Sequence, residues 1–182
     1  MDIGLAHDDM TDALLELMDC VGRSALDAAS LQALAGDFRA LSRRIKAAGE
    51  DASGTHAIDP MLRRGTLTPT VTITSQDERS VRGVVTFGPR YGVGKPHGGA
   101  IPLMMLDVMG RLVNAGGRPR SFTAELVTDF RSITPGDTEL TVKAWLTAED
   151  GRKRRARAEL WHNERLCAGA EGLFIAASAD PA

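Results

Sequence analysis

The stretch GKPHGGAIPLMMLDVMG, residues 94–110, combines glycines, one histidine and one carboxylate with an almost wholly apolar run. His97, Gly98 and Gly99 stand directly before the apolar residues, which predicts a turn entering a buried helix. The first N–H groups of a helix have no partner within it and lie at its positive end, so they can hold an oxyanion. The stretch therefore predicts either the entry to a core helix or a catalytic helix N-terminus.

Two carboxylates are candidates for a general base near this turn. Asp107 is the only residue of 100–109 that is neither apolar nor proline. It also stands four residues before Arg111, the spacing of a surface ion pair worth a few tenths of a kcal/mol. Glu125 follows Thr123 by two residues, so in a strand these two side chains would share one face. Whether Asp107 is a base or the solvated partner of Arg111 stays open at this point.

A central helix over residues 98–115 must position this stretch. Residues 100–109 leave almost no polar stripe, and a helix that is apolar nearly all round is a buried helix. Ala115-Gly116-Gly117 supplies its C-terminal stop. Because one buried helix needs cover on most sides, we expect an antiparallel sheet curled around it.

Segments that alternate β-branched and polar residues predict the strands of that sheet. Turns separate them at Gln76-Asp77-Glu78 and at the motifs TPGD and AEDG. The predicted strands span 66–75, 80–88, 120–133, 137–149, 152–163 and 166–177. The chain is therefore predicted to be an α+β protein.

The N-terminal part predicts a helical extension. Residues 8–49 read as helices, with a shorter first helix that breaks near Gly22. An apolar stripe at helical spacing, expected to be core packing, is formed by Leu31, Leu34, Phe38, Leu41 and Ile45. Residues 50–60 are a loop by composition. We expect an extension and loop over 1–60, whose role stays open, and the sheet-and-helix domain over 61–182.

Composition and charge exclude several classes of protein. The chain has 182 residues, 43% hydrophobic and 25% charged, which is typical of a globular domain. A net charge of −2 and 4% aromatic residues argue against nucleic acid, and no apolar run reaches the roughly 18 residues of a membrane helix. Cys20 and Cys167 form no CxxC pair, and the acidic start lacks a signal pattern. We expect a soluble, cytoplasmic protein without metal, cofactor, nucleic-acid or membrane partner.

Two basic features are candidates for phosphate contacts. Lys95 lies in GVGKP, which lacks the spacing of a P-loop or a Rossmann fingerprint, so it is either solvated or meets a phosphate of another kind of ligand. GRKRRARAE, residues 151–159, is the one basic cluster. It fits the charged edge of a hairpin, or Arg154 and Arg155 bind phosphate with their planar forks.

The motif GxxHGGAIPL before the buried helix, followed by TAELxxDFRxxTPG on the next strand, resembles the hotdog-fold acyl-CoA thioesterases of the PaaI-like branch. The closing RARAELWHNERLCAGAEGLF is similar to that family's final hairpin. The resemblance covers roughly residues 66–178 and leaves the N-terminal helices outside. It implies a hotdog fold, in which an antiparallel sheet of about six strands wraps around one long central helix.

The resemblance also implies an activity and a set of roles. The activity is hydrolysis of a small or medium acyl-CoA thioester, bound between subunits of a homodimer or homotetramer. Gly99 would point its N–H at the thioester carbonyl, His97 would hold the entry loop or the thioester, and Thr123 would position the attacking water. The expected substrate contacts are Gly98, Lys95, Arg154 and Arg155.

One position departs from the family's pattern. The family's helix carboxylate usually stands nine residues after the histidine, and that position is Leu106. Asp107 comes one residue later, about 100° further around a regular helix. Asp107 or Glu125 therefore replaces the usual base, or hydrolysis is lost. The alternative function is a non-hydrolytic acyl-CoA-binding or regulatory hotdog protein.

Overall fold

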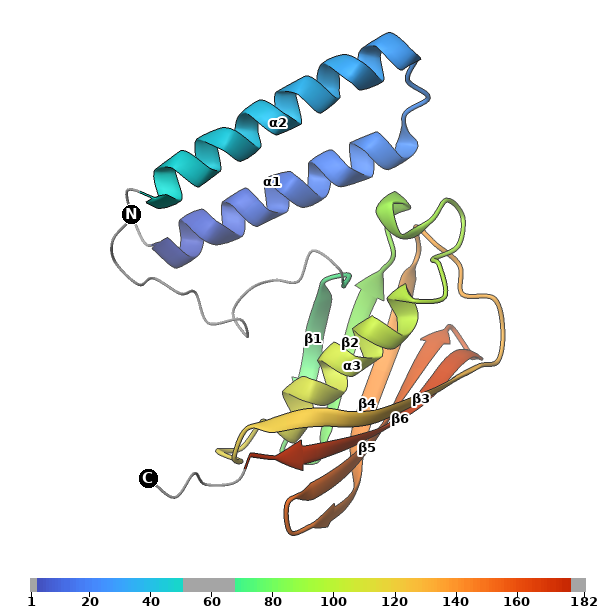
Figure 1. The fold of residues 1–182 in the computed structure, drawn as a ribbon. Coiled ribbons are helices and arrows are strands. Elements are labelled where there is room, and N and C mark those ends of the chain that lie inside the picture. The colour runs from blue at the N-terminus through green and yellow to red at the C-terminus, as the bar shows by residue number, and fades with distance from the viewer. Residues whose placement is uncertain (1–2, 51–67, 178–182) are drawn as a thin grey trace. The chain divides into compact units, whose positions relative to one another are not determined.

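The computed structural model of the chain describes residues 3–50 and 68–177 (Figure 1). The described residues form two compact units, one of residues 3–22 with 68–177 and one of residues 23–50. The predicted loop at 50–60 falls almost wholly outside the described residues, as does the start of the strand predicted at 66–75. The predicted domain boundary at residue 60 stays a prediction.

Two helices precede the sheet, α1 (Ile3–Arg23) and α2 (Ala28–Glu50). The break predicted near Gly22 falls at residues 24–27, where Asp27 Oδ1 accepts the backbone N–H of Ser30 at 2.7 Å. This hydrogen bond stabilises the carboxylate and lowers the pKa of Asp27. Most of the apolar stripe predicted to be core packing is instead exposed on α2, namely Leu31, Phe38, Leu41 and Ile45.

The remaining elements form one six-stranded antiparallel sheet with the order β1-β2-β4-β5-β6-β3, and the helix α3 lies against one face (Figure 1). Their bounds are β1 Val71–Gln76, β2 Ser80–Thr86, α3 Ala100–Val113, β3 Ser121–Phe130, β4 Glu139–Asp150, β5 Lys153–His162 and β6 Arg165–Ala176, with a 3₁₀ turn, η1, at Pro89–Tyr91. The six predicted strands and the central helix are confirmed. The strand predicted over 120–133 ends earlier, at Phe130.

The core lies between α3 and the inward face of the sheet. On α3 the buried side chains are Ala100, Ile101, Met104, Met105, Val108, Met109, Leu112 and Val113. The facing strands carry small residues where the helix passes, such as Ala156, Ala158 and Gly172. A Cβ at Gly172 would lie 2.7 Å from the ring of Phe174 and 3.3 Å from Met109 Cε. The small residues therefore let the sheet wrap closely around the helix.

A bulge in β3 changes the face of the sheet on which the following side chains of that strand lie. Thr123 pairs with Phe174, whereas Glu125 pairs with the next residue of β6, Leu173, so Ala124 is an extra residue. Paired residues of an antiparallel ladder lie on the same face, and Phe174 is in the core while Leu173 is on the outer side. The predicted shared face of Thr123 and Glu125 is wrong, because a bulge breaks the period of two.

The TPGD turn before β4 packs on the glycine-rich loop that precedes α3. Gly136 N–H donates to the carbonyl of Gly94 at 3.0 Å, and Asp137 N–H donates to the carbonyl of Phe87. A Cβ at Gly136 would lie 3.2 Å from the carbonyl carbon of Gly94. Glycine at this position therefore permits a close backbone contact that fixes the loop leading to the central helix.

Candidate active site

The N-terminus of α3 presents backbone donors that folding does not use. Gly99 is the residue that caps the helix, with φ −78° and ψ −24°, and both Gly98 and Gly99 are exposed. Among the described residues, no hydrogen bond is donated by the N–H of either glycine. A Cβ at Gly98 would meet no atom within 4 Å. This helix end is therefore open to a ligand that accepts hydrogen bonds.

His97 holds the turn through its backbone, and its ring lies beside Gly99. Its N–H donates to the carbonyl of Tyr91 at 2.6 Å, and its own carbonyl accepts the N–H of Ala100 at 3.0 Å. A Cβ at Gly99 would lie 3.4 Å from Nδ1 of the exposed His97 ring. The structure thus brings together two of the predicted catalytic residues.

The loop before His97 is tightly closed. Gly92 has φ 133°, and a Cβ there would lie 2.4 Å from the carbonyl oxygen of Lys95, so only glycine fits. Tyr91 beneath it is buried and meets Phe87 edge-on, with ring centroids 5.8 Å apart. Burial raises the pKa of Tyr91, so its phenol stays neutral at physiological pH. These contacts give the glycine turn a rigid base.

A cleft of about 320 Å³ lies beside the start of α3. Its lining includes Lys95, Gly98, Ile101, Phe130, Ile133 and Thr134. It combines an ammonium group and glycine backbone with three apolar side chains, so it suits a ligand that is partly anionic and partly apolar. Phe130, Ile133 and Thr134 were not among the predicted site residues. All three lie within the segment TAELxxDFRxxTPG that follows the central helix, so this motif could have indicated them as site residues.

Asp107 is not close to Gly99 within one copy of the chain. Its Oδ2 lies 3.1 Å from Nε of Arg111, and both side chains are partly exposed. Eight residues separate it from Gly99, which is about 12 Å along a helix axis. Leu106, at the position of the family's carboxylate, packs partly buried against the core. The ion pair of Asp107 with Arg111, one of the two alternatives from the sequence, is therefore confirmed, whereas a role of Asp107 as base stays a prediction.

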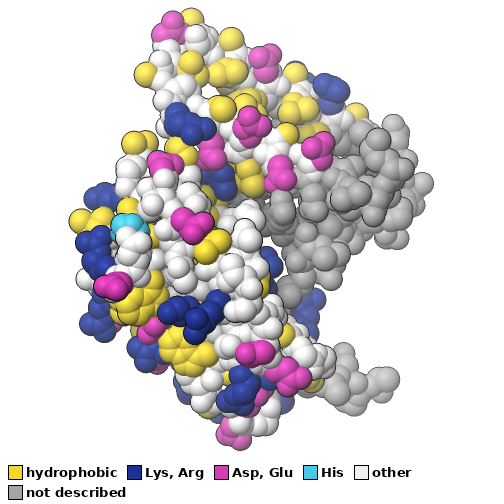
Figure 2. All heavy atoms as spheres, turned by 180° about the vertical axis from the view of Figure 1, so that it is seen from behind, with side chains coloured by type: hydrophobic (Ala, Val, Ile, Leu, Met, Phe, Trp, Pro, Cys, Tyr) yellow, Lys and Arg dark blue, Asp and Glu magenta, His cyan; other side chains and the backbone are white. Residues whose placement is uncertain are grey.

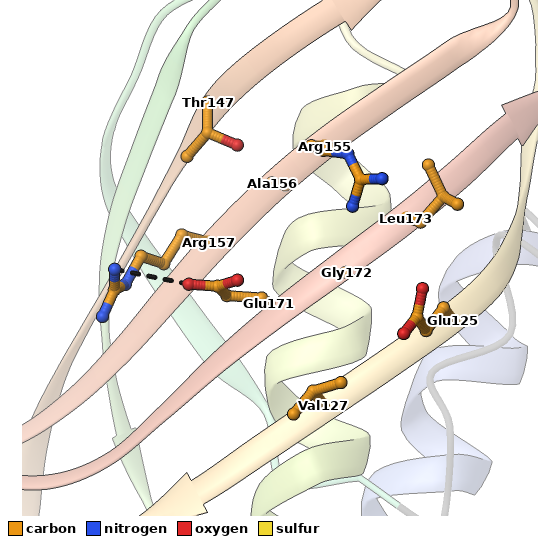
Figure 3. Close-up of a pocket in the computed structure, with 9 residues that line it drawn as sticks. All are labelled: Glu125, Val127, Thr147, Arg155, Ala156, Arg157, Glu171, Gly172 and Leu173. Carbon is orange, nitrogen blue, oxygen red and sulfur yellow. Dashed lines mark ion pairs between the residues drawn. The ribbon is translucent and has the colours of Figure 1, made fainter.

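Glu125 and Arg155 lie on the other face of the sheet from α3 (Figure 3). They line a hollow of about 270 Å³, beside an ion pair of 3.4 Å between Arg157 and Glu171. In Figure 3 these side chains project from strands that have the central helix behind them. Figure 2, the view from behind, shows Lys and Arg side chains interspersed with acidic and hydrophobic ones. The structure therefore does not bring Glu125 or Arg155 together with His97 and Gly99.

Arg154 points inward, although it neighbours Arg155 in the sequence. Its guanidinium donates to the carbonyls of Val113 at 3.1 Å and Pro119 at 2.8 Å, and to the hydroxyl of Ser121. Its side chain is only 7% exposed, and its Nε lies 3.5 Å from Glu149. Its Nη1 and Nε groups are engaged at the C-terminal end of α3, so this buried placement gives no support to a phosphate contact.

Within residues 3–50 and 68–177, no group of three or more His, Cys, Asp or Glu side chains is placed to hold a metal ion. No helix in the same ranges is long and apolar enough to cross a membrane.

No family model and no curated protein matches the sequence. The fold, however, matches many solved structures. One crystal structure, described as a thioesterase superfamily protein, is 27% identical with a TM-score of 0.73, over 93% of this chain and 94% of its own. The chain belongs to the hotdog thioesterase superfamily.

Two further hotdog structures match with less of this chain. The PaaI protein from the phenylacetic acid degradation operon of E. coli is 18% identical, with a TM-score of 0.53, over 58% of this chain and 82% of its own. A hypothetical thioesterase of Streptococcus pneumoniae with coenzyme A is 14% identical, with a TM-score of 0.56, over 60% and 90%. At these identities the two matches show the fold alone.

Proposed function

We propose that this hotdog protein hydrolyses the thioester of a small or medium acyl-CoA at the N-terminus of α3. The observation that carries the proposal is the pair of free, exposed N–H groups at Gly98 and Gly99. Preorganised N–H groups at a helix N-terminus stabilise the oxyanion that forms when water attacks a thioester carbonyl. The adjoining cleft offers apolar side chains for the acyl or pantetheine chain and Lys95 for a phosphate.

We infer that a second copy of the chain completes the site. A carboxylate that activates the attacking water must lie within about two hydrogen bonds, roughly 6 Å, of the reacting carbon. Asp107 lies about twice that distance from Gly99 of its own copy. It stands on the part of α3 that the sheet leaves exposed, together with Leu103 and Arg111. In this proposal the carboxylate serves Gly99 of the partner.

The edge of the sheet supports this assembly. β3 is a terminal strand of the sheet, and it carries exposed Phe122, Val127 and Phe130. An unpaired strand edge with apolar side chains favours pairing with another strand. Light scattering at micromolar concentration tests the inference, with a dimer or larger oligomer as the expected result. A stable monomer would remove the composite site.

A second function is favoured by a specific observation. Leu106 stands where the resemblance places a carboxylate, and Asp107 is engaged by Arg111. If Arg111 holds the carboxylate away from the thioester, the protein binds acyl-CoA without hydrolysing it.

Release of thiol from short, medium, long and aromatic acyl-CoAs distinguishes the two functions, with CoA binding followed by calorimetry. Hydrolysis of at least one class is expected, and Asp107→Asn should lower kcat about 10²-fold or more with CoA affinity nearly unchanged. Arg111→Met is the matched control, since it breaks the same ion pair and leaves the carboxylate. Binding of acyl-CoA without turnover in the wild type would favour the non-hydrolytic function.

A further inference from the structure

A contact between α1 and the 3₁₀ turn η1 lies next to the candidate site. Asp19 stands near the end of α1, and its Oδ2 lies 2.9 Å from Nη1 of Arg90. Its Oδ1 accepts the backbone N–H of the same arginine at 3.2 Å. The side chains of Arg90 and Asp19 are only 11% and 21% exposed, so solvent and salt screen this pair less than a surface pair. One carboxylate therefore holds both the backbone and the side chain of the turn.

Two glycines let the helix and the turn approach each other. A Cβ at Gly88 would lie 3.1 and 3.2 Å from the two carboxylate oxygens of Asp19. A Cβ at Gly22, on α1, would lie 3.4 Å from the carbonyl oxygen of Pro89. The contact is thus a close fit on both sides, with the carboxylate in the space that a side chain at position 88 would take.

The turn is connected to the glycine pair by two further contacts. The guanidinium of Arg90 lies 4.5 Å from the centre of the Tyr91 ring, and that ring is buried. The carbonyl of Tyr91 accepts the N–H of His97 at 2.6 Å. His97 is two residues before Gly99. A continuous series of contacts therefore runs from Asp19 to the start of α3.

We propose that Asp19 is a positioning residue of the candidate site. It fixes η1 and, through Tyr91 and His97, the direction in which Gly99 presents its N–H. The kinetic part of this inference rests on the proposed function, whereas the effect on the His97 amide does not. Donors to an oxyanion must be held within a fraction of an ångström, and a displacement of 1 Å costs about 10²-fold in rate. The N-terminal helix α1 thereby contributes to catalysis without touching substrate.

The experiment compares Asp19→Ala with Glu16→Ala. Both replace an acidic residue of α1, but Glu16 is exposed and has no ion pair among the described residues. Asp19→Ala should speed hydrogen exchange of the His97 amide at least about tenfold, because the Tyr91 carbonyl is no longer held. It should lower kcat about tenfold and leave KM within about twofold. Glu16→Ala should leave exchange and kinetics as in the wild type.

Arg90→Ala and the double variant complete the test. If the two residues act as one unit, the double variant loses no more kcat than the worse single variant. Wild-type exchange at His97 in Asp19→Ala would overturn the proposal, as would faster exchange spread evenly over the whole domain. If the wild type hydrolyses no acyl-CoA, the proposed function fails, and the local exchange at His97 alone decides whether Asp19 positions the turn.

Discussion

The two ends of the central helix α3 differ in whether their terminal backbone groups have hydrogen-bond partners in the protein. At the C-terminal end, polar side chains donate hydrogen bonds to the last carbonyls of the helix. Arg154 donates to the carbonyl of Val113, and Asn114 Nδ2 donates to the carbonyl of Gly110 at 2.8 Å. At the N-terminal end, Gly98 and Gly99 are exposed, and in residues 68–177 nothing accepts their N–H groups. The orphan groups of a helix end are satisfied by side chains, by water or by a ligand. Because protein groups occupy the C-terminal carbonyls and none among residues 68–177 accepts the Gly98 and Gly99 N–H groups, the N-terminal end is the one at which a ligand can replace water.

The same comparison explains how the basic cluster is divided. Arg154 shares the inward face of β5 with Ala156 and Ala158, whereas Arg155 projects from the outer face. Side chains alternate along a strand, so neighbouring arginines cannot form one patch. Arg154 therefore stabilises the C-terminal end of α3, and of these two arginines only Arg155 is placed to contact another molecule.

The largest expected effect on stability is at the C-terminal end. Arg154→Met should lower the free energy of unfolding by about 3 kcal/mol, because it leaves the buried carbonyl of Val113 and the part-buried carbonyl of Pro119 without this donor. Arg155→Met is the matched control and should change stability by less than about 0.5 kcal/mol. Urea denaturation measures both. Equal losses of unfolding free energy in the two variants would mean that the hydrogen bonds of Arg154 do not specifically stabilise the C-terminal end of α3.

A smaller loss is expected for Asn114→Ala. The side chain donates to Gly110 and its Oδ1 accepts the N–H of Ser121 at 2.7 Å, so two hydrogen bonds are lost. The expected cost is about 1–2 kcal/mol. Thiol release should stay within about twofold of wild type, since this end of α3 is remote from the proposed oxyanion donors. A large loss of kcat with normal stability would contradict the assignment of the C-terminal end of α3 to the fold alone.

The smallest effect on stability is expected for Gly98→Ala at the open end. The added methyl group meets no atom within 4 Å, so stability should change by less than about 0.5 kcal/mol. Because Gly98 lines the cleft, CoA affinity measured by calorimetry should fall several-fold when a methyl group is added there. If the variant unfolds at lower urea but binds CoA normally, position 98 serves the fold instead of a ligand.

Much of the fold could be predicted from local patterns. The apolar run gave the central helix, and the alternating segments gave six strands, because each pattern has the period of its element. The i,i+4 spacing of Asp107 and Arg111 likewise indicated their ion pair as one of the two alternatives for Asp107. The inward position of Arg154 was also present in the sequence, since its face in the alternation carries Ala156 and Ala158.

Other features depended on tertiary structure. The bulge at Ala124 places Thr123 and Glu125 on opposite faces, and no residue spacing indicates the extra residue. The ion pair of Asp19 with Arg90 joins positions 71 residues apart, so no periodicity connects them. The cleft beside α3 gathers residues from two segments that only the folded sheet brings together. Sequence therefore predicted the elements better than the contacts between them.

Replacement of the backbone donor at Gly99 tests the central claim most directly. Proline lacks the N–H, and the φ of −78° at Gly99 suits its ring at the start of a helix. For a protein whose circular dichroism remains that of wild type, Gly99→Pro should lower kcat for acyl-CoA hydrolysis about 10²- to 10³-fold. Gly99→Ala, which keeps the N–H, should stay within about tenfold of wild type. A folded Gly99→Pro variant with wild-type turnover would contradict the account.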